Sequence, residues 1–396
     1  MPTAVDLALA YSMRYARALL LNNPNMIITR KIEVFVCESD KDLRRAYYDK
    51  LYANRDIAVK VANMAVSHLF ALDNTMPYLS DDDKETITFL GCKGQKATKQ
   101  NAPYVAASNA FKGKADMGMI SCVLQNAQKM YQDDRKKGMW KRSLRSYKGD
   151  MPVPFKADRF IDMRFADYTC KDGVVRKGCF FTLMGVPFQM KFGRDRSGNA
   201  LIVERVVSGE YKISTSSLQF VGNKVFLLLC CDIPKKEVQL DKEKVLCARL
   251  DVMVPITCAI GKKTFEIGTK EEFCYRRTQI QAALRRCQIN NRYTNGGKGR
   301  KKKCQAVDHW HEKEKNYVTT KLHTYSRMLV DLAEKHKCGR IVLIDQKRRE
   351  DDAKERNMNG EPFVLRNWSY YRLKDKIAYK CKMSGIELSQ DETTNT

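Results

Sequence analysis

The sequence predicts an α+β protein of several domains. Its 396 residues allow two or three domains with a sizeable core. An apolar, β-branched run at residues 244–255 predicts a buried strand, and shorter apolar runs follow at 256–260 and 264–267. A basic helix at 269–289, a second helix, a strand at 340–344, a helix at 368–384 and a short strand at 386–388 come next. Three strands in a meander, then helix, strand, helix and strand, is the order of a ribonuclease-H-like core.

The first half of the chain has a different pattern. Short strands with turn signals about every ten residues fill 160–233, which predicts an antiparallel barrel or sandwich. The alternating segment 29–37 is expected to join it. Residues 40–72 are strongly helical, and a polar, helix-rich stretch continues to about 147. Residues 5–21 predict an amphipathic helix, because Arg14 and Arg17 interrupt a run that is too short to cross a bilayer.

Charge indicates the kind of partner. The net charge is +26, from 72 Lys and Arg against 46 Asp and Glu. Such an excess favours a polyanion, because cations gain affinity by displacing counterions from phosphates. A ribosome-like or merely soluble basic protein is the alternative. The 14 cysteines include no C-x-x-C pair, which is typical of free thiols in a reducing cytosol.

Several segments resemble the RuvC-type domain of the transposon-encoded TnpB proteins and of the miniature type V CRISPR effectors (type V-F-like). The first strand of that family reads Lys-Val-Leu-Gly-Val-Asp-Leu-Gly-Val-x-x-Pro. The matching positions are Lys244, Val245, Leu246, Leu250, Val252 and Pro255, and the likeness continues at Arg276-Arg277, Leu284-Arg285-Arg286, Gly299-Arg300-Lys301-Lys302-Lys303 and Trp368-Ser369-Tyr370-Tyr371-Arg372-Leu373. The likeness spans roughly residues 185–388, about half of the chain.

The resemblance implies a domain plan. It places an N-terminal helix and the first wedge strand at 1–38, and a helical recognition lobe at 39–149. An OB-like β-barrel wedge domain, into which that lobe is inserted, is expected at 150–240. A truncated ribonuclease-H-like (RuvC-type) α/β domain without the family's zinc ribbon is expected at 241–396.

The same alignment predicts a degenerate nuclease site. Active relatives use carboxylates that hold two Mg²⁺ ions. The first of these carboxylates falls on Arg249 and the second on Ile344, and the chain stops at Thr396 before the third. We therefore expect a protein that is not an enzyme, with no catalytic Mg²⁺ and no zinc. The alternative is an active nuclease that uses Asp251 and Asp345, although Asp251 lies about 7 Å further along the strand than residue 249.

Basic residues form three candidate nucleic-acid-binding groups. A glycine-lysine loop, a helix and a tight turn carry them, and their guanidinium and ammonium groups suit phosphate contact. The candidates are Lys298, Arg300, Lys301, Lys302 and Lys303 in the loop, Arg276, Arg277, Arg285 and Arg286 on the helix, and Arg194 and Arg196 at the turn. A solvated turn or a nonspecific basic run is the alternative for each group. Trp368, Tyr370 and Tyr371 are candidates for stacking on bases, although Trp368 suits core packing better.

By resemblance, the chain binds a guide RNA and then a double-stranded DNA target beside a short motif, without cutting it. The expected outcome is transcriptional regulation in the bacterial cytoplasm (nucleoid), by blocking RNA polymerase or by recruiting a partner such as a sigma factor. The resemblance also allows a homodimer on one guide, and no membrane association is expected. A guide-independent transposition accessory protein that binds nucleic acid is a further alternative.

Overall fold

The computed structural model describes residues 25–80, 91–92, 101–138, 144–169, 173–193, 198–234, 239–251, 254–269, 271–293, 304–344 and 369–390. The chain divides into two compact units, Met1–Ile233 and Pro234–Thr396. The predicted helix at 5–21 lies outside the described residues. The mixed α+β class is confirmed, whereas the finer division into four domains stays a prediction.

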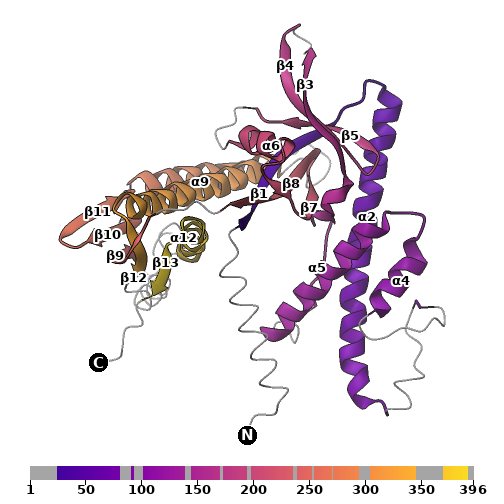
Figure 1. The fold of residues 1–396 in the computed structure, drawn as a ribbon, viewed down its shortest axis with the longest axis horizontal. Helices are drawn as coiled ribbons and strands as arrows, with labels where there is room; N and C mark the ends of the chain where they lie inside the picture. The colour runs from indigo at the N-terminus through magenta and orange to yellow at the C-terminus, as the bar shows by residue number, and fades with distance from the viewer. Residues whose placement is uncertain are drawn as a thin grey trace. The chain divides into compact units, whose positions relative to one another are not determined.

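The first unit contains an eight-stranded sheet. Its strands are β1 (Asn25–Val36), β2 (Val153–Phe155), β3 (Phe160–Thr169), β4 (Val175–Leu183), β5 (Val186–Lys191), β6 (Lys212–Ile213), β7 (Ser216–Val221) and β8 (Lys224–Pro234). They follow the order β2-β7-β8-β1-β5-β4-β3, with β6 paired to β8 (Figure 1). β1 pairs antiparallel with β5, so the strand predicted at 29–37 joins this sheet. Stacked rings of Phe181 and Phe188, 5.3 Å apart, are part of its core.

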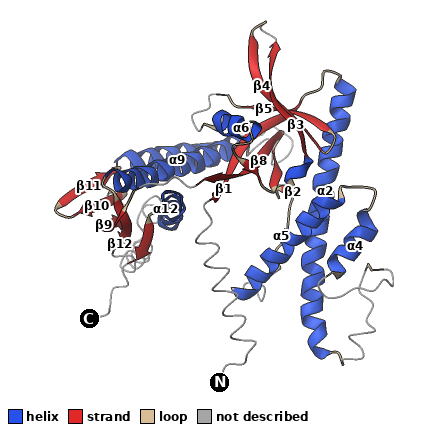
Figure 2. Cartoon of the chain, viewed as in Figure 1, coloured by secondary structure: helices blue, strands red, loops and turns tan. Residues whose placement is uncertain are grey.

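The helices of the first unit lie between β1 and β2 in sequence, apart from η3 and α6. They are α2 (Lys41–Thr75), η1 (Met76–Tyr78), α4 (Ala102–Phe111), α5 (Met117–Lys136), the short η3 (Ala157–Arg159) and α6 (Asn199–Val207). α2 begins at Asp40, whose carboxylate accepts hydrogen bonds from the N–H groups of Asp42 and Leu43. Leu72 of α2 packs with Ala102 and Ala106 of α4, and Val66 and Leu69 of α2 pack with Tyr131 of α5 (Figure 2).

The second unit contains the predicted meander and the two later strands. They are β9 (Asp241–Leu250), β10 (Ile256–Ile260), β11 (Lys263–Ile267), β12 (Cys338–Leu343) and β13 (Glu387–Gln390). The order across the sheet is β11-β10-β9-β12-β13. β10 is antiparallel to both β9 and β11, whereas β12 is parallel to both β9 and β13.

Helices cover one face of this second sheet. They are the π-helix η4 (Glu271–Tyr275), α9 (Gln305–Lys335) and α12 (Tyr370–Ser384), whereas α7 (Arg276–Tyr293) packs against α9. Leu246, Ala248 and Leu250 of β9 are fully buried in one cluster with Leu322 of α9 and Ile377 of α12. The alternate side chains of β9 face the opposite side and are half-buried or exposed.

Among the described residues, no helix has the length and apolarity that a bilayer crossing requires. The predicted compartment stays a prediction.

Candidate nucleic-acid interface

Two of the three predicted basic groups cannot be placed. The loop residues Lys298, Arg300, Lys301, Lys302 and Lys303 lie outside the described residues, as do Arg194 and Arg196 of the tight turn. Their roles stay predictions.

The third basic group lies on α7, and three of its four arginines are exposed. Arg276, Arg285 and Arg286 lie on the solvent side of the helix. Arg276 donates a hydrogen bond to the side-chain oxygen of Gln279 at 3.0 Å, so its acceptor is uncharged. These three guanidinium groups remain accessible to phosphate, as the prediction requires.

Arg277 differs, and its prediction as a phosphate ligand does not fit its surroundings. The residue is only 4% exposed. Its Nε and Nη2 atoms each lie 3.2 Å from Oε1 of Glu314 on α9, and its guanidinium lies 5.4 Å from the ring centre of Phe273. A buried charge requires such a partner, because desolvation without one is expensive. Arg277 therefore joins α7 to α9 within the protein.

The two positions predicted to be degenerate RuvC positions, Arg249 and Ile344, are neighbours on the second sheet. Arg249 is half-buried, faces away from the helix-covered core and pairs with Thr257 of β10. On the other side of β9, Leu343 pairs with Ala248, and the N–H of Ile344 donates to the carbonyl of Ala248 at 3.0 Å. Positions 249 and 344 thus meet at the ends of two adjacent parallel strands.

The pair of Mg²⁺ ions that the resemblance implies does not fit these two side chains. A guanidinium repels a cation, and isoleucine offers no donor atom. Asp251 lies just beyond β9, where its N–H donates to the carbonyl of Pro255 at 3.4 Å. Asp345 lies outside the described residues.

A set of basic residues that the sequence did not reveal lies between α9 and α12. We call Arg372, Lys376, Lys380 and His323 the α9–α12 cation cluster. Nη2 of Arg372 donates to Oγ1 of Thr319 at 2.7 Å. Nζ of Lys376 lies 2.9 Å from Nε2 of His323. Nζ of Lys380 donates to Oγ of Ser326 at 2.9 Å and to the backbone carbonyl of His323.

The acceptors of all three cations in this part of the described chain are neutral. Other basic side chains of α9 are paired instead: Arg327 with Asp331 at 2.9 Å, and Lys321 with Glu272. The α9–α12 cation cluster therefore concentrates positive charge that its hydrogen-bond partners do not neutralise.

Burial, and after it mutual repulsion, lowers the pKa values of three side chains of the cluster. Burial, then the charges of Lys376, Lys380 and Arg372, lowers the pKa of His323. Burial and then Arg372 lower the pKa of Lys376. Burial, followed by Arg327 and Lys376, lowers the pKa of Lys380 to about 8, although Asp331 acts in the opposite direction. A phosphate placed here would relieve this repulsion, which makes the cluster a candidate polyanion site.

Exposed aromatic rings lie on the same helix as the three cations. The side chains of Tyr371 and Tyr379 are 62% and 45% exposed, and both suit base stacking. Tyr370 is only 7% exposed and packs in the core, so the expectation that it stacks on bases is wrong. Trp368 lies outside the described residues.

We expect Lys380→Met to stabilise the protein at pH 7. An unfolded lysine titrates near its ordinary value of 10.5, whereas Lys380 titrates at about 8 in the folded protein. The unfolded state therefore binds more protons between these values, so the lysine costs folding free energy below pH 8, and this cost disappears as the pH rises to 10.5. The gain at pH 7 should be on the order of 1–3 kcal/mol, measured by denaturant unfolding.

Lys382→Met is the matched control, because Lys382 is exposed on the same helix. Lys382→Met should change the free energy of unfolding little at pH 7 and at pH 10. A Lys380→Met protein that is less stable than the unsubstituted chain at pH 7, or that shows the same difference at pH 7 and pH 10, would contradict the electrostatic account.

No family model matches the sequence. The CRISPR-associated endodeoxyribonuclease Cas12f1 of Sulfoacidibacillus thermotolerans is 28% identical over 308 residues, which cover 71% of this chain and 68% of the relative. The protein of the same name from Syntrophomonas palmitatica is 30% identical over 207 residues, which cover 48% of this chain but only 39% of the relative.

A solved structure has a similar fold over nearly the whole chain. It is the cryo-EM structure of a Cas12f1-sgRNA-target DNA complex, with a TM-score of 0.63 and 14% sequence identity. The superposition covers 93% of this chain and 89% of the other. At this identity, the likeness concerns the fold alone.

The names of the relatives contradict one prediction. The expectation that the chain is not an enzyme rested on Arg249, Ile344 and the end of the sequence, whereas both relatives are named endodeoxyribonucleases. Two side chains describe only part of a site, and that part did not justify the conclusion.

The two homologues, the similar fold and the motifs of the second unit point in the same direction. These findings support the resemblance to the miniature type V-F CRISPR effectors, among which the relatives named Cas12f1 are counted.

Proposed function

We propose that this chain binds a guide RNA and, through it, a complementary double-stranded DNA beside a short motif that the protein reads. The observation that carries the proposal is the α9–α12 cation cluster, in which Arg372, Lys376 and Lys380 are held by neutral acceptors. Arg372 is exposed and Lys376 is half-buried, so these two cations are accessible to a polyanion, while Lys380 beneath them is buried. The net charge of +26 extends the attraction over the molecule.

The relatives indicate which polyanion. The solved neighbour is named as a complex of Cas12f1 with sgRNA and target DNA. In guided binding of this kind, base pairing selects the sequence, while the protein holds the backbone and reads the adjacent motif. The strand order β11-β10-β9-β12-β13 supports a RuvC-type assignment of the second unit. The eight-stranded sheet supports an OB-like wedge in the first.

Transcriptional regulation is a proposed consequence of occupancy. A guided complex that stays bound at a promoter blocks RNA polymerase, or holds a transcription partner such as a sigma factor nearby. A promoter reporter tests this directly: its transcript level should change only when the guide matches the promoter. An unchanged transcript with a matching guide would count against regulation.

We expect the double substitution Arg372→Ala and Lys376→Ala to weaken guide RNA binding and reduce its salt dependence. RNA that co-purifies with the protein is sequenced, synthesised and titrated at several salt concentrations. Each lost phosphate contact lowers the slope of log affinity against log salt by roughly 0.7–0.9, so the pair should lower it by roughly 1.4–1.8.

The matched control is Lys335→Ala with Lys382→Ala, two exposed lysines on α9 and α12 outside the cluster. In this control, the slope of log affinity against log salt should fall less than in the Arg372→Ala and Lys376→Ala variant. Equal slopes for both double variants would mean that the cluster has no special part in RNA binding, and the absence of any discrete co-purified RNA would count against the guided function.

Guide-directed DNA cleavage is the second candidate function, favoured by the names of the two relatives. Because Arg249 and Ile344 supply no metal ligand, the carboxylates would have to come from other positions. Asp251 lies two residues beyond Arg249, just after β9. Asp345 follows Ile344 in sequence.

Cleavage, if it is the function, should depend on both aspartates. We expect Asp251→Ala or Asp345→Ala to abolish cutting of a matched DNA target in Mg²⁺ or Mn²⁺, with guide RNA affinity unchanged. Asp375→Ala, an exposed carboxylate on α12, is the control and should cut normally. A matched target that is bound by the unsubstituted complex yet remains intact in both metals would eliminate this candidate.

A further inference from the structure

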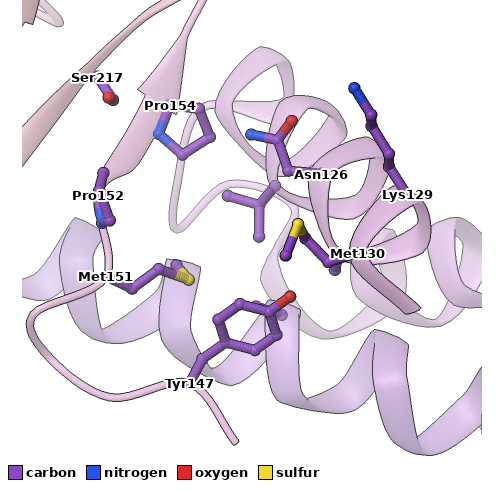
Figure 3. A pocket seen from close by; sticks show the side chains of 11 residues that line it. Asn126, Lys129, Met130, Tyr147, Met151, Pro152, Pro154 and Ser217 are labelled. Carbon is purple, nitrogen blue, oxygen red and sulfur yellow. The ribbon is translucent and has the colours of Figure 1, made fainter. Parts of the chain in front are cut away.

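The first unit contains a pocket that no part of the proposed function uses. It lies where α2 and α5 meet the segment entering β2 and the neighbouring strand β7 (Figure 3). Its volume is about 350 Å³, near the lower end of the range for small-molecule sites. This size suits one ring system rather than an extended ligand.

The pocket combines apolar walls with neutral polar groups. Met130 of α5 faces Met151 and Pro154 across the opening (Figure 3), and Val123 of α5 also lines the pocket. The amide of Asn126, the hydroxyl of Tyr147 and the hydroxyl of Ser217 are the neutral polar groups of the lining. Among the lining residues, only Lys129 carries a formal charge, and its exposed side chain belongs to the rim. The interior therefore favours a neutral ligand with apolar faces.

Tyr147 is held firmly in this wall. Its N–H donates to Oδ1 of Asn63 at 2.8 Å, and its carbonyl accepts from Nδ2 of the same side chain at 3.0 Å. Burial raises the pKa of the Tyr147 hydroxyl. That hydroxyl is buried and has no hydrogen-bond partner within the described part of the chain, and it is turned toward Met130 (Figure 3). A ligand that forms a hydrogen bond with this buried hydroxyl would be stabilised, because the hydroxyl otherwise lacks a partner in this part of the structure.

We propose that the pocket receives one unpaired nucleobase of the bound nucleic acid, an inference that rests on the function proposed above. A base is flat and neutral, with faces that pack on Met130 and Pro154 and an edge that bonds to Tyr147 and Asn126. Lys129 at the rim suits a phosphate of the same strand. A charged ligand is excluded from the interior, because no opposite charge is present to offset its desolvation.

The nucleobase could come from the guide RNA or from a DNA strand displaced by guide pairing. An unpaired base enters a pocket at little cost, because no base pair has to be broken. Both sources share the chemistry that the pocket recognises, so the experiment must distinguish them.

The test combines abasic substitution with two pocket variants. Each nucleotide of the guide RNA, and in a second series each nucleotide of the displaced DNA strand, is replaced in turn by an abasic site. Affinity for each is measured with the unsubstituted protein, Tyr147→Phe and Asn126→Ala. Tyr147→Phe keeps the backbone bonds to Asn63, so it should fold normally.

We expect one position, in one of the two series, at which the abasic site weakens binding by about 2- to 10-fold in the unsubstituted protein. At that position the abasic site should not weaken binding further in Tyr147→Phe or in Asn126→Ala, because each variant has already lost the pocket contact. The control Gln125→Ala, an exposed neighbour on α5 outside the lining, should behave like the unsubstituted protein.

The outcomes separate this inference from the function on which it rests. If the unsubstituted protein binds no guide RNA, both are overturned. If guide RNA binds normally and every abasic effect is the same in Tyr147→Phe, Asn126→Ala and the unsubstituted protein, only the nucleobase pocket is overturned.

Discussion

The parallel pairing of β9 with β12 is the interaction on which the second unit depends. Gly339 allows the strands to approach, since a Cβ atom there would lie 2.6 Å from the carbonyl oxygen of Asp241. At the other end, the N–H of Ile344 donates to the carbonyl of Ala248 at 3.0 Å. Because α9 runs directly into β12 and α12 precedes its partner β13, this pairing brings the two helices together over the buried face of β9.

The contact between α9 and α12 has a functional consequence. Leu322 and Ile377 are fully buried between the helices and the sheet, whereas Arg372 and Lys376 point to the solvent side with His323. Packing thus buries Lys380 and brings like charges together at a cost in stability, which the low pKa of Lys380 reflects. Arg277 shows the contrasting solution, in which Glu314 neutralises a buried guanidinium. The Arg277–Glu314 pair joins two helices, whereas the α9–α12 cation cluster is suited to an external polyanion.

The apolar, β-branched run at 244–255 predicted the first strand of the second unit, because such a run is a local signal. Local signals could not distinguish Arg276 from Arg277, since burial of the second depends on Glu314, far away in sequence. The spacing of Arg372, Lys376 and Lys380 every four residues was visible on α12, but its partners on α9 were not. The pocket beside Tyr147 is also nonlocal, because α2, α5, β2 and β7 all contribute to it.

A mismatch series tests most directly whether the protein recognises DNA through a guide RNA. Binding of the protein–guide complex is measured on DNA targets that carry one mismatch at each position, counted from the adjacent motif. Because forming the RNA–DNA heteroduplex is nearly balanced against opening the DNA, early mismatches should stop the exchange. We predict that mismatches within the first ~8–12 positions abolish binding while distant ones have less effect. Equal affinity for all targets, with or without the guide, would instead mean that the charge of +26 serves guide-free binding.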